Sequence, residues 1–176
     1  MKNLLVEIYT VGSCWPIPDG YGGWCFVLRY PVEEGQIPVR FPLEIGTGSE
    51  EHTTTNRMEL MAIRNAVLHI RKKTSWPGLV QDVDLHLYTD SSYAKHALTD
   101  WAIKWKESGW LNSLGEPVGN QDLIKETLAG LTALRRRGTP VQFHKVKGHS
   151  GNPWNDMADK FAGGERVKIT PKGFRK

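Results

Sequence analysis

The stretch that is most informative about the fold is Val6-Glu7-Ile8-Tyr9-Thr10-Val11-Gly12-Ser13-Cys14, near the start of the chain. It overlaps residues 4–11, a run rich in β-branched and aromatic side chains that predicts a β-strand. Residues 24–30 and about 39–45 have the same character, and segments containing Pro and Gly separate the three runs. This part of the chain therefore predicts a three-stranded antiparallel meander.

The rest of the chain alternates between helical and extended patterns. Residues 56–72 predict a helix, because apolar side chains from Ala62 to Ile70 recur at helical spacing. Asn56 followed by Glu59 resembles a capping box at its start. Further elements are expected as a strand over residues 82–89, a short helix opening at Ser91, helices over 100–110 and 122–137, a strand over 141–146 and a helix over 153–162. This order predicts an α/β fold, a mixed sheet with helices on its faces.

Composition bounds the class of protein. The 176 residues fit one domain, which we place at 1–162, followed by a short, basic, mobile tail at 163–176. The formal charge of +4 permits a polyanionic partner without requiring one. Two cysteines exclude a disulfide framework or a zinc-ligand pattern, and favour a reducing cytoplasm. No apolar run approaches the ~18 residues of a membrane span. We expect a soluble monomer with no membrane partner.

Three acidic residues lie at positions where a charged side chain suggests a functional role. Glu59 shares the apolar face of its helix, and a buried charge is costly unless it is paired or binds a cation; the alternative is a capping Glu. Asp90 ends a parallel-type strand, where ligand sites form in α/β sheets; the alternative is an N-cap. Asp159 shares a helix stripe with Asn155 and Ala158; the alternative is a solvated charge.

If these three carboxylates converge, they suit a hard divalent cation, which prefers oxygen ligands. Two such ions about 4 Å apart can clamp an in-line phosphoryl displacement. His149 lies in a glycine-flanked loop, where its imidazole is suited to proton transfer near neutral pH. A lone loop histidine is otherwise inert.

Four blocks of sequence resemble type 1 ribonuclease H. They are Val6–Cys14, Thr55–Ala62, Tyr88–Tyr93, and Val146–Gly151 running on to Asn155 and Asp159. The resemblance implies a ribonuclease H-like fold, a five-stranded mixed sheet flanked by helices. It implies endonucleolytic hydrolysis of the RNA strand of RNA–DNA hybrids. It also assigns Glu59, Asp90 and Asp159 to Mg²⁺ binding, with Mn²⁺ as the other candidate ion, and His149 to proton transfer.

The first block departs from that family. The family pattern there is Thr-Asp-Gly-Ser, with an Asp that touches both metals, whereas this chain has Val11, which cannot bind a cation. Two hypotheses remain: a two-metal nuclease impaired at Val11, and a catalytically inactive protein that binds hybrids. A third, a transposase or integrase-type nuclease, shares the fold class but lacks support from the Lys147–His149 loop.

Aromatic and basic side chains interleave in one helical segment, which resembles the family's DNA-tracking handle. They are Trp101, Lys104, Trp105 and Lys106. Read without the resemblance, the two tryptophans lie one turn apart and are typical of core packing. Asn56 resembles the family's contact to the RNA backbone and 2′-hydroxyl. Cys14 matches another substrate-contact position, although a small buried hydrophobe is its alternative.

Overall fold

A computed structural model describes residues 3–15, 20–31, 43–74 and 82–164. Ten elements follow one another in this part of the chain: β1 (Leu4–Trp15), β2 (Tyr21–Arg29), β3 (Leu43–Glu50), α1 (Thr55–Thr74), β4 (Val83–Thr89), α2 (Ser92–Leu98), α3 (Asp100–Glu107), α4 (Gln121–Arg136), β5 (Val141–Lys145) and α5 (Pro153–Ala162). None of the helices in these residues is long and apolar enough to cross a membrane.

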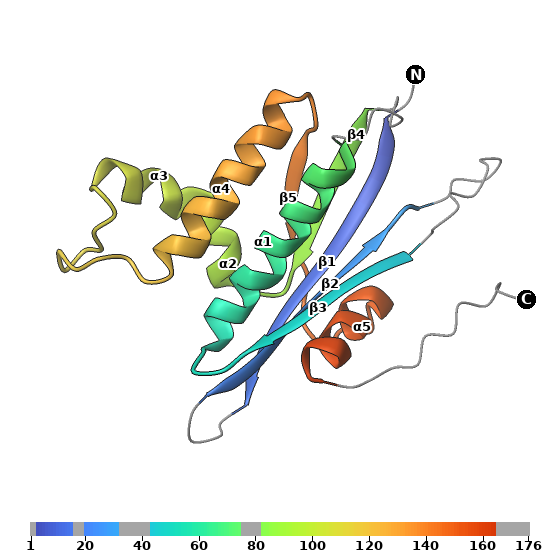
Figure 1. The fold of residues 1–176 in the computed structure, drawn as a ribbon, viewed down its shortest axis with the longest axis horizontal. Helices are drawn as coiled ribbons and strands as arrows, with labels where there is room; N and C mark the ends of the chain where they lie inside the picture. Colours follow the sequence, from blue (N-terminus) through green and yellow to red (C-terminus); the bar gives the residue numbers. More distant parts are fainter. Residues whose placement is uncertain (1–2, 16–19, 32–42, 75–81, 165–176) are drawn as a thin grey trace, which may run out of the picture.

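The strands form one mixed sheet in the order β3-β2-β1-β4-β5 (Figure 1). β1 to β3 form the predicted antiparallel meander, and β4 and β5 run parallel to β1. The α/β architecture of a five-stranded mixed sheet flanked by helices is therefore confirmed. Its central position makes β1 the strand that both halves of the sheet share.

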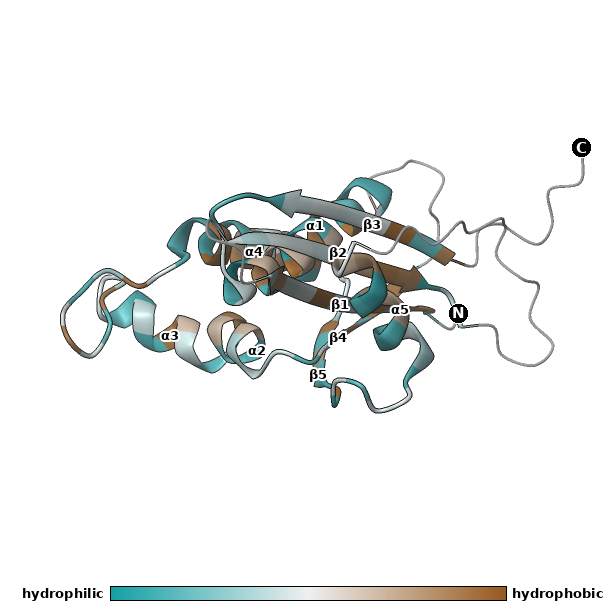
Figure 2. Cartoon of the chain, turned by 90° about the horizontal axis from the view of Figure 1, so that it is seen from below, coloured by the Kyte–Doolittle hydropathy of each residue, from teal (hydrophilic) through white to brown (hydrophobic). Residues whose placement is uncertain are grey.

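Alternation along β1 divides the apolar side chains between two layers. Val6 and Ile8 face the layer that holds α1 and α4, while Tyr9 and Val11 face α5. The hydrophobic segments, brown in Figure 2, run along the central strands β1 and β4. The predicted apolar face of α1 is confirmed, because every one of its members is buried: Ala62, Ile63, Ala66, Val67 and Ile70.

Several boundaries differ from expectation. β1 continues to Trp15 because its end pairs with the start of β2, where Trp15 lies opposite Tyr21. The third strand, described as Leu43–Glu50, continues past its predicted end at Ile45, and residues 39–42 of the prediction lie outside the described residues. α3 stops at Glu107, since Gly109 and Trp110 adopt positive φ angles that a helix cannot continue. Of the predicted tail, only Gly163 and Gly164 are described.

The capping box predicted at Asn56 is wrong. The helix begins at Thr55, and the Thr54 hydroxyl accepts a hydrogen bond from the Arg57 amide at 3.2 Å. Threonine is a good cap because its oxygen satisfies one of the free amides at a helix start. Asn56 therefore lies inside the first turn with its side chain exposed, and Glu59 has no capping role there.

α1 touches β1 most closely at Gly12. A Cβ atom at this position would lie 2.2 Å from the Glu59 backbone nitrogen and 2.4 Å from the Met58 carbonyl carbon. Both neighbours are backbone atoms, so they cannot move aside without moving the helix. Only glycine allows this contact.

We expect Gly12→Ala to lower the free energy of unfolding by roughly 3 kcal/mol, since overpacking of this kind forces backbone shifts. Guanidinium unfolding followed by circular dichroism measures the change. Gly119→Ala is the matched control, because nothing lies within 4 Å of its added Cβ. Equal stabilities of the two variants would show that α1 does not need the close contact.

Candidate active site

Three elements carry the predicted carboxylates to one end of the sheet. Glu59 comes from α1, Asp90 follows the last residue of β4, and Asp159 comes from α5. These carboxylates interact electrostatically. Asp90 and Asp159 both raise the pKa of Glu59, and Asp159 raises the pKa of Asp90. The three carboxylates therefore lie within electrostatic reach of one another.

Glu59 is the most deeply buried member, with 5% of its surface exposed. Burial, followed by the negative charge of Asp90, raises the pKa of its carboxyl well above the usual range. A hydrogen bond from the Gly12 amide acts in the opposite direction. Its Oε2 atom is buried without a hydrogen-bond partner. Such an acceptor is costly to bury unless a cation or a proton satisfies it.

Asp90 lies partly buried after the end of β4, beside Gly148. Burial raises the pKa of its carboxyl most strongly, while a hydrogen bond from the Asn155 side chain and the charge of Lys145 lower it. The alternative role as a helix cap is wrong: Ser91 caps α2, its hydroxyl accepting from the Ala94 amide at 3.0 Å. A Cβ at Gly148 would lie 3.1 Å from Asp90 Oδ2, so that glycine leaves room beside the carboxylate.

Asp159 faces the loop that carries His149. The distance between His149 Nδ1 and Asp159 Oδ2 is 3.8 Å, and the His149 side chain is 85% exposed. The Asp159 side chain is only 37% exposed, so it is not the fully solvated charge of the alternative interpretation. The arrangement leaves an imidazole free to meet a bound molecule while a carboxylate lies within electrostatic reach.

Val11 lies on β1, one residue past Thr10. Thr10 lies in register with Thr89 on the parallel strand β4, so residue 11 lies beside Asp90. Its side chain is 2% exposed and packs in an apolar cluster with Tyr9, Cys25 and Ala158. The strand register thus places the departure from the family pattern next to the carboxylates.

The residues present fit a loosely held cation. Within the described ranges, no three Asp, Glu, His or Cys side chains lie close enough to form a preformed metal centre. Two buried acceptors nevertheless lack partners, Glu59 Oε2 and Asn155 Oδ1. Mg²⁺ is commonly held by one or two carboxylates and several waters, which this donor set can supply.

Lys145, which the sequence did not single out, is a fourth charged group at the site. It ends β5 in register with Thr89, and its ammonium donates to the backbone carbonyls of Asp90 and, at 3.1 Å, of Val146. Its charge lowers the pKa of both Asp90 and Glu59. The sequence signal was its place at the end of an alternating strand, next to the Lys147–His149 loop.

The predicted handle projects from the body of the molecule, where α3 and the following loop extend away from the sheet (Figure 1). Lys104 and Lys106 are exposed there, and Trp101 is 36% exposed. Trp105 instead packs against the main core, with its ring 5.7 Å from that of Trp101. Core packing therefore describes Trp105, whereas Trp101 stays available to a partner.

Two further predicted contacts lie at the same end as Glu59. Asn56 is exposed in the first turn of α1. Cys14 is partly buried near the end of β1, and its thiol lies 3.6 Å from the Thr53 carbonyl oxygen, to which it donates. Cys14 therefore joins β1 to the segment that enters α1.

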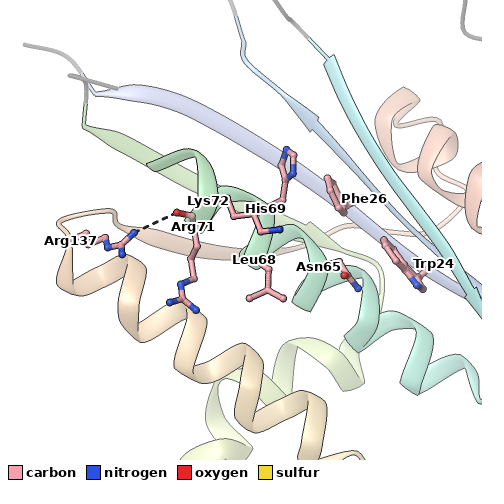
Figure 3. Close-up of a pocket in the computed structure, with 8 residues that line it drawn as sticks. All are labelled: Trp24, Phe26, Asn65, Leu68, His69, Arg71, Lys72 and Arg137. Atoms are coloured by element: carbon pink, nitrogen blue, oxygen red, sulfur yellow. Dashed lines mark hydrogen bonds between the residues drawn. The ribbon is translucent and has the colours of Figure 1, made fainter. Parts of the chain in front are cut away.

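A cavity of about 490 Å³ lies elsewhere, along α1 (Figure 3). It is lined by Trp24, Phe26, Asn65, Leu68, His69, Arg71, Lys72 and Arg137. None of these is a predicted site residue. The candidate active site is accordingly an open carboxylate cluster and not this cavity.

Comparison with known proteins agrees with the geometry. The RNase H family model matches residues 3–166. Ribonuclease H of Parvibaculum lavamentivorans is 37% identical over 158 residues, covering 90% of this chain and 89% of that protein. Ribonuclease H of Marinobacter nauticus is 41% identical over 157 residues, covering 89% and 90%. The chain belongs to the ribonuclease H family.

Solved structures show the same ribonuclease H fold. LC9-RNase H1, a type 1 RNase H with the type 2 active-site motif, superposes with a TM-score of 0.73 at 26% identity, covering 93% of this chain and 74% of that chain. The foamy viral protease-reverse transcriptase in complex with an RNA/DNA hybrid superposes at 0.61 and 20% identity. That match covers 92% of this chain and 20% of the viral one, and it shows the fold alone.

The raised pKa of Glu59 predicts how stability depends on pH without metal. Because the pKa of Glu59 is raised in the folded state, ionising its carboxyl lowers the free energy of unfolding. Stability therefore falls as the pH rises from about 4.3, the pKa in the unfolded chain, through the pKa in the folded protein. We expect Glu59→Gln to melt several degrees higher than the unchanged chain at pH 7–8 in EDTA. The advantage should vanish near pH 4, in melting curves followed by circular dichroism.

The matched control is Glu107→Gln, because Glu107 is exposed at the end of α3 and lies in none of the charge contacts of Glu59. Its melting temperature should follow that of the unchanged chain across the same pH range. A Glu59→Gln protein that melts lower at neutral pH would contradict the cost assigned to this buried charge.

Proposed function

We propose that this protein binds RNA–DNA hybrids and hydrolyses their RNA strand with divalent metal ions, at a rate greatly reduced by Val11. The single observation that carries the proposal is the buried, unpartnered Glu59 Oε2 beside the charge of Asp90, in a chain of the ribonuclease H family. A buried carboxylate of this kind is suited to hold a cation.

The metal ligands would be Glu59, Asp90 and Asp159, holding Mg²⁺ or Mn²⁺. When bound in a two-metal arrangement, the ions supply an activated water and charge stabilisation for the leaving 3′ oxygen. His149 is the proposed proton carrier, since its exposed imidazole can reach the leaving oxygen. The Asp159 Oδ2 atom lies 3.8 Å from the Nδ1 atom of this ring.

Val11 is expected to limit this chemistry. An aspartate here would offer both a charge and an oxygen next to Asp90, and valine offers neither. Losing a mere supporting partner of a metal site typically costs 10–100-fold, so the loss of a shared ligand should cost more. The alternative, a hybrid-binding protein without cleavage, draws support from the same residue, because Val11 is well packed as a core side chain.

Substrate contacts are proposed on the side that carries the handle and the start of α1. Lys104 and Lys106 would follow the DNA backbone, because phosphate contacts by basic side chains dominate nucleic-acid affinity. Trp101 and Trp105 would shape the handle. Asn56 and Cys14 would face the RNA strand, where contact with a 2′-hydroxyl distinguishes RNA from DNA.

Restoring the missing ligand provides the main test. In Mg²⁺, we expect Val11→Asp to raise hybrid cleavage by at least ~100-fold, as a shared ligand should exceed the effect of a supporting partner. The affinity for the hybrid should stay within about threefold, since phosphate contacts dominate it. A labelled hybrid, assayed by gel for cleavage and by filter binding in Ca²⁺, gives both quantities.

Val11→Asn is the matched control, since it adds an oxygen of similar size without the charge and should recover far less activity. Slow, metal-dependent cleavage by the unchanged chain supports the nuclease. Binding with no detectable cleavage supports the alternative. Robust cleavage by the unchanged chain, with no gain from Val11→Asp, would refute the role assigned to residue 11.

The handle can be tested by the salt dependence of binding. We expect the Lys104→Ala, Lys106→Ala double variant to weaken binding at low salt and to reduce the slope of log K against log [salt] by about 1.8. The matched control replaces two exposed basic residues elsewhere, Lys72 and Lys160. An unchanged slope in the handle variant would exclude these lysines from phosphate contact.

A further inference from the structure

A basic cavity lies toward the opposite end of α1 from the candidate active site. It has a volume of about 490 Å³, which is within the range of pockets that take small ligands (Figure 3). Its lining includes the cations Arg71, Lys72 and Arg137, and none of the described residues that line it is acidic. Lys72 and Glu59 are separated by roughly 20 Å along the axis of α1. The cavity is therefore separate from the carboxylate cluster.

Two aromatic rings of β2 form one wall of this cavity, because the edge strand β3 gives them room. Trp24 lies opposite Gly48 on β3, and a Cβ atom at Gly48 would be 2.5 Å from the Trp24 ring. Phe26 lies opposite Gly46 in the same way, and the corresponding distance is 2.2 Å. The planes of the two rings are within 13° of parallel. The glycines of β3 thus let both rings lie over the edge of the sheet.

Of the two rings, Trp24 is the one that can meet a ligand. Phe26 is only 4% exposed, and the His69 ring lies 5.4 Å from its centre. Trp24 is partly buried, and Asn65 lines the same cavity. The Asn65 amide donates to the Met61 carbonyl at 2.7 Å, and its side-chain oxygen is an acceptor. An indole ring and an amide together suit a planar base, which stacks and forms hydrogen bonds at its edge.

The cations of the cavity come from the ends of two helices. Arg71 and Lys72 lie in the last turn of α1, and Arg137 follows the last residue of α4. Arg137 Nη1 donates to the Arg71 carbonyl at 3.5 Å, which links the two helix ends (Figure 3). Helix dipoles favour basic residues at C-termini, so these charges alone would not indicate a ligand. Their place beside an aromatic wall does, because a nucleotide carries both a base and a phosphate.

We propose that the cavity along α1 binds a segment of single-stranded nucleic acid, with one base against Trp24 and its phosphates near Lys72 and Arg137. Grooves that combine basic and aromatic side chains bind single strands in this way, since every base has a face that can stack. The bases of a duplex are already stacked on one another and are not free to enter. A blunt RNA–DNA hybrid at the handle should therefore leave the cavity unoccupied.

Fluorescence anisotropy with a short, labelled oligodeoxyadenylate tests this without any cleavage, because DNA is not the strand proposed to be cut. An abasic strand of the same length keeps the phosphates and loses the bases, so it should bind on the order of tenfold more weakly. AMP, used as an unlabelled competitor, should also bind more weakly, because it has a single phosphate. Equal binding of the abasic strand or of AMP would overturn the proposal.

A pair of double variants locates the site. We expect Lys72→Ala, Arg137→Ala to reduce the slope of log K against log [salt] for the oligodeoxyadenylate by about 1.4, and to leave the affinity for a blunt hybrid unchanged. The handle variant Lys104→Ala, Lys106→Ala is the matched control and should do the reverse. Circular dichroism confirms that both variants are folded. Equal losses of single-strand binding in the two variants, or no binding of the oligodeoxyadenylate at millimolar concentration, would overturn this inference while leaving the proposed nuclease standing.

Discussion

The close contact between α1 and β1 at Gly12 is the constraint on which the site depends. Because residue 12 has no side chain, the helix backbone comes near enough for the Gly12 amide to bond the Glu59 carboxylate. That contact buries one oxygen of Glu59 without a partner and brings its charge under the influence of Asp90. The same strand carries Val11 and pairs with β4, so it also places Val11 beside Asp90.

Local patterns were enough to predict most of the elements, because apolar spacing reports the side that faces the core. The start of α1 was misjudged, since Asn56 and Thr54 are both good caps and only tertiary packing chooses between them. Taken alone, Asp159 was better explained as a solvated charge, because its burial and its neighbours depend on how α5 packs against the sheet. Lys145 was missed for a related reason: its approach to Asp90 follows from the pairing of β4 with β5, which no local pattern encodes.

Burial and mutual repulsion between carboxylates dominate the electrostatics of the cluster. Burial raises the pKa of both Glu59 and Asp90, and each of them is raised further by neighbouring carboxylates. The groups that oppose this are the Gly12 amide, the Asn155 side chain and the Lys145 ammonium. Such a balance costs folding stability, and proteins commonly accept that cost where charge is needed for chemistry.

Val11 lies at a position that can serve either core packing or metal binding, depending on the residue. In its present form it fills space between β1 and α5, in contact with the cluster that includes Ala158 and Ala162. An aspartate there would exchange apolar contacts for a buried charge among other negative charges, and would therefore weaken the fold until a cation arrived. Stability and the proposed activity would therefore favour opposite residues at this position. Each mutation that comes to rely on the valine packing would make the return to aspartate harder, so an evolutionary path away from catalysis would be easier to enter than to leave.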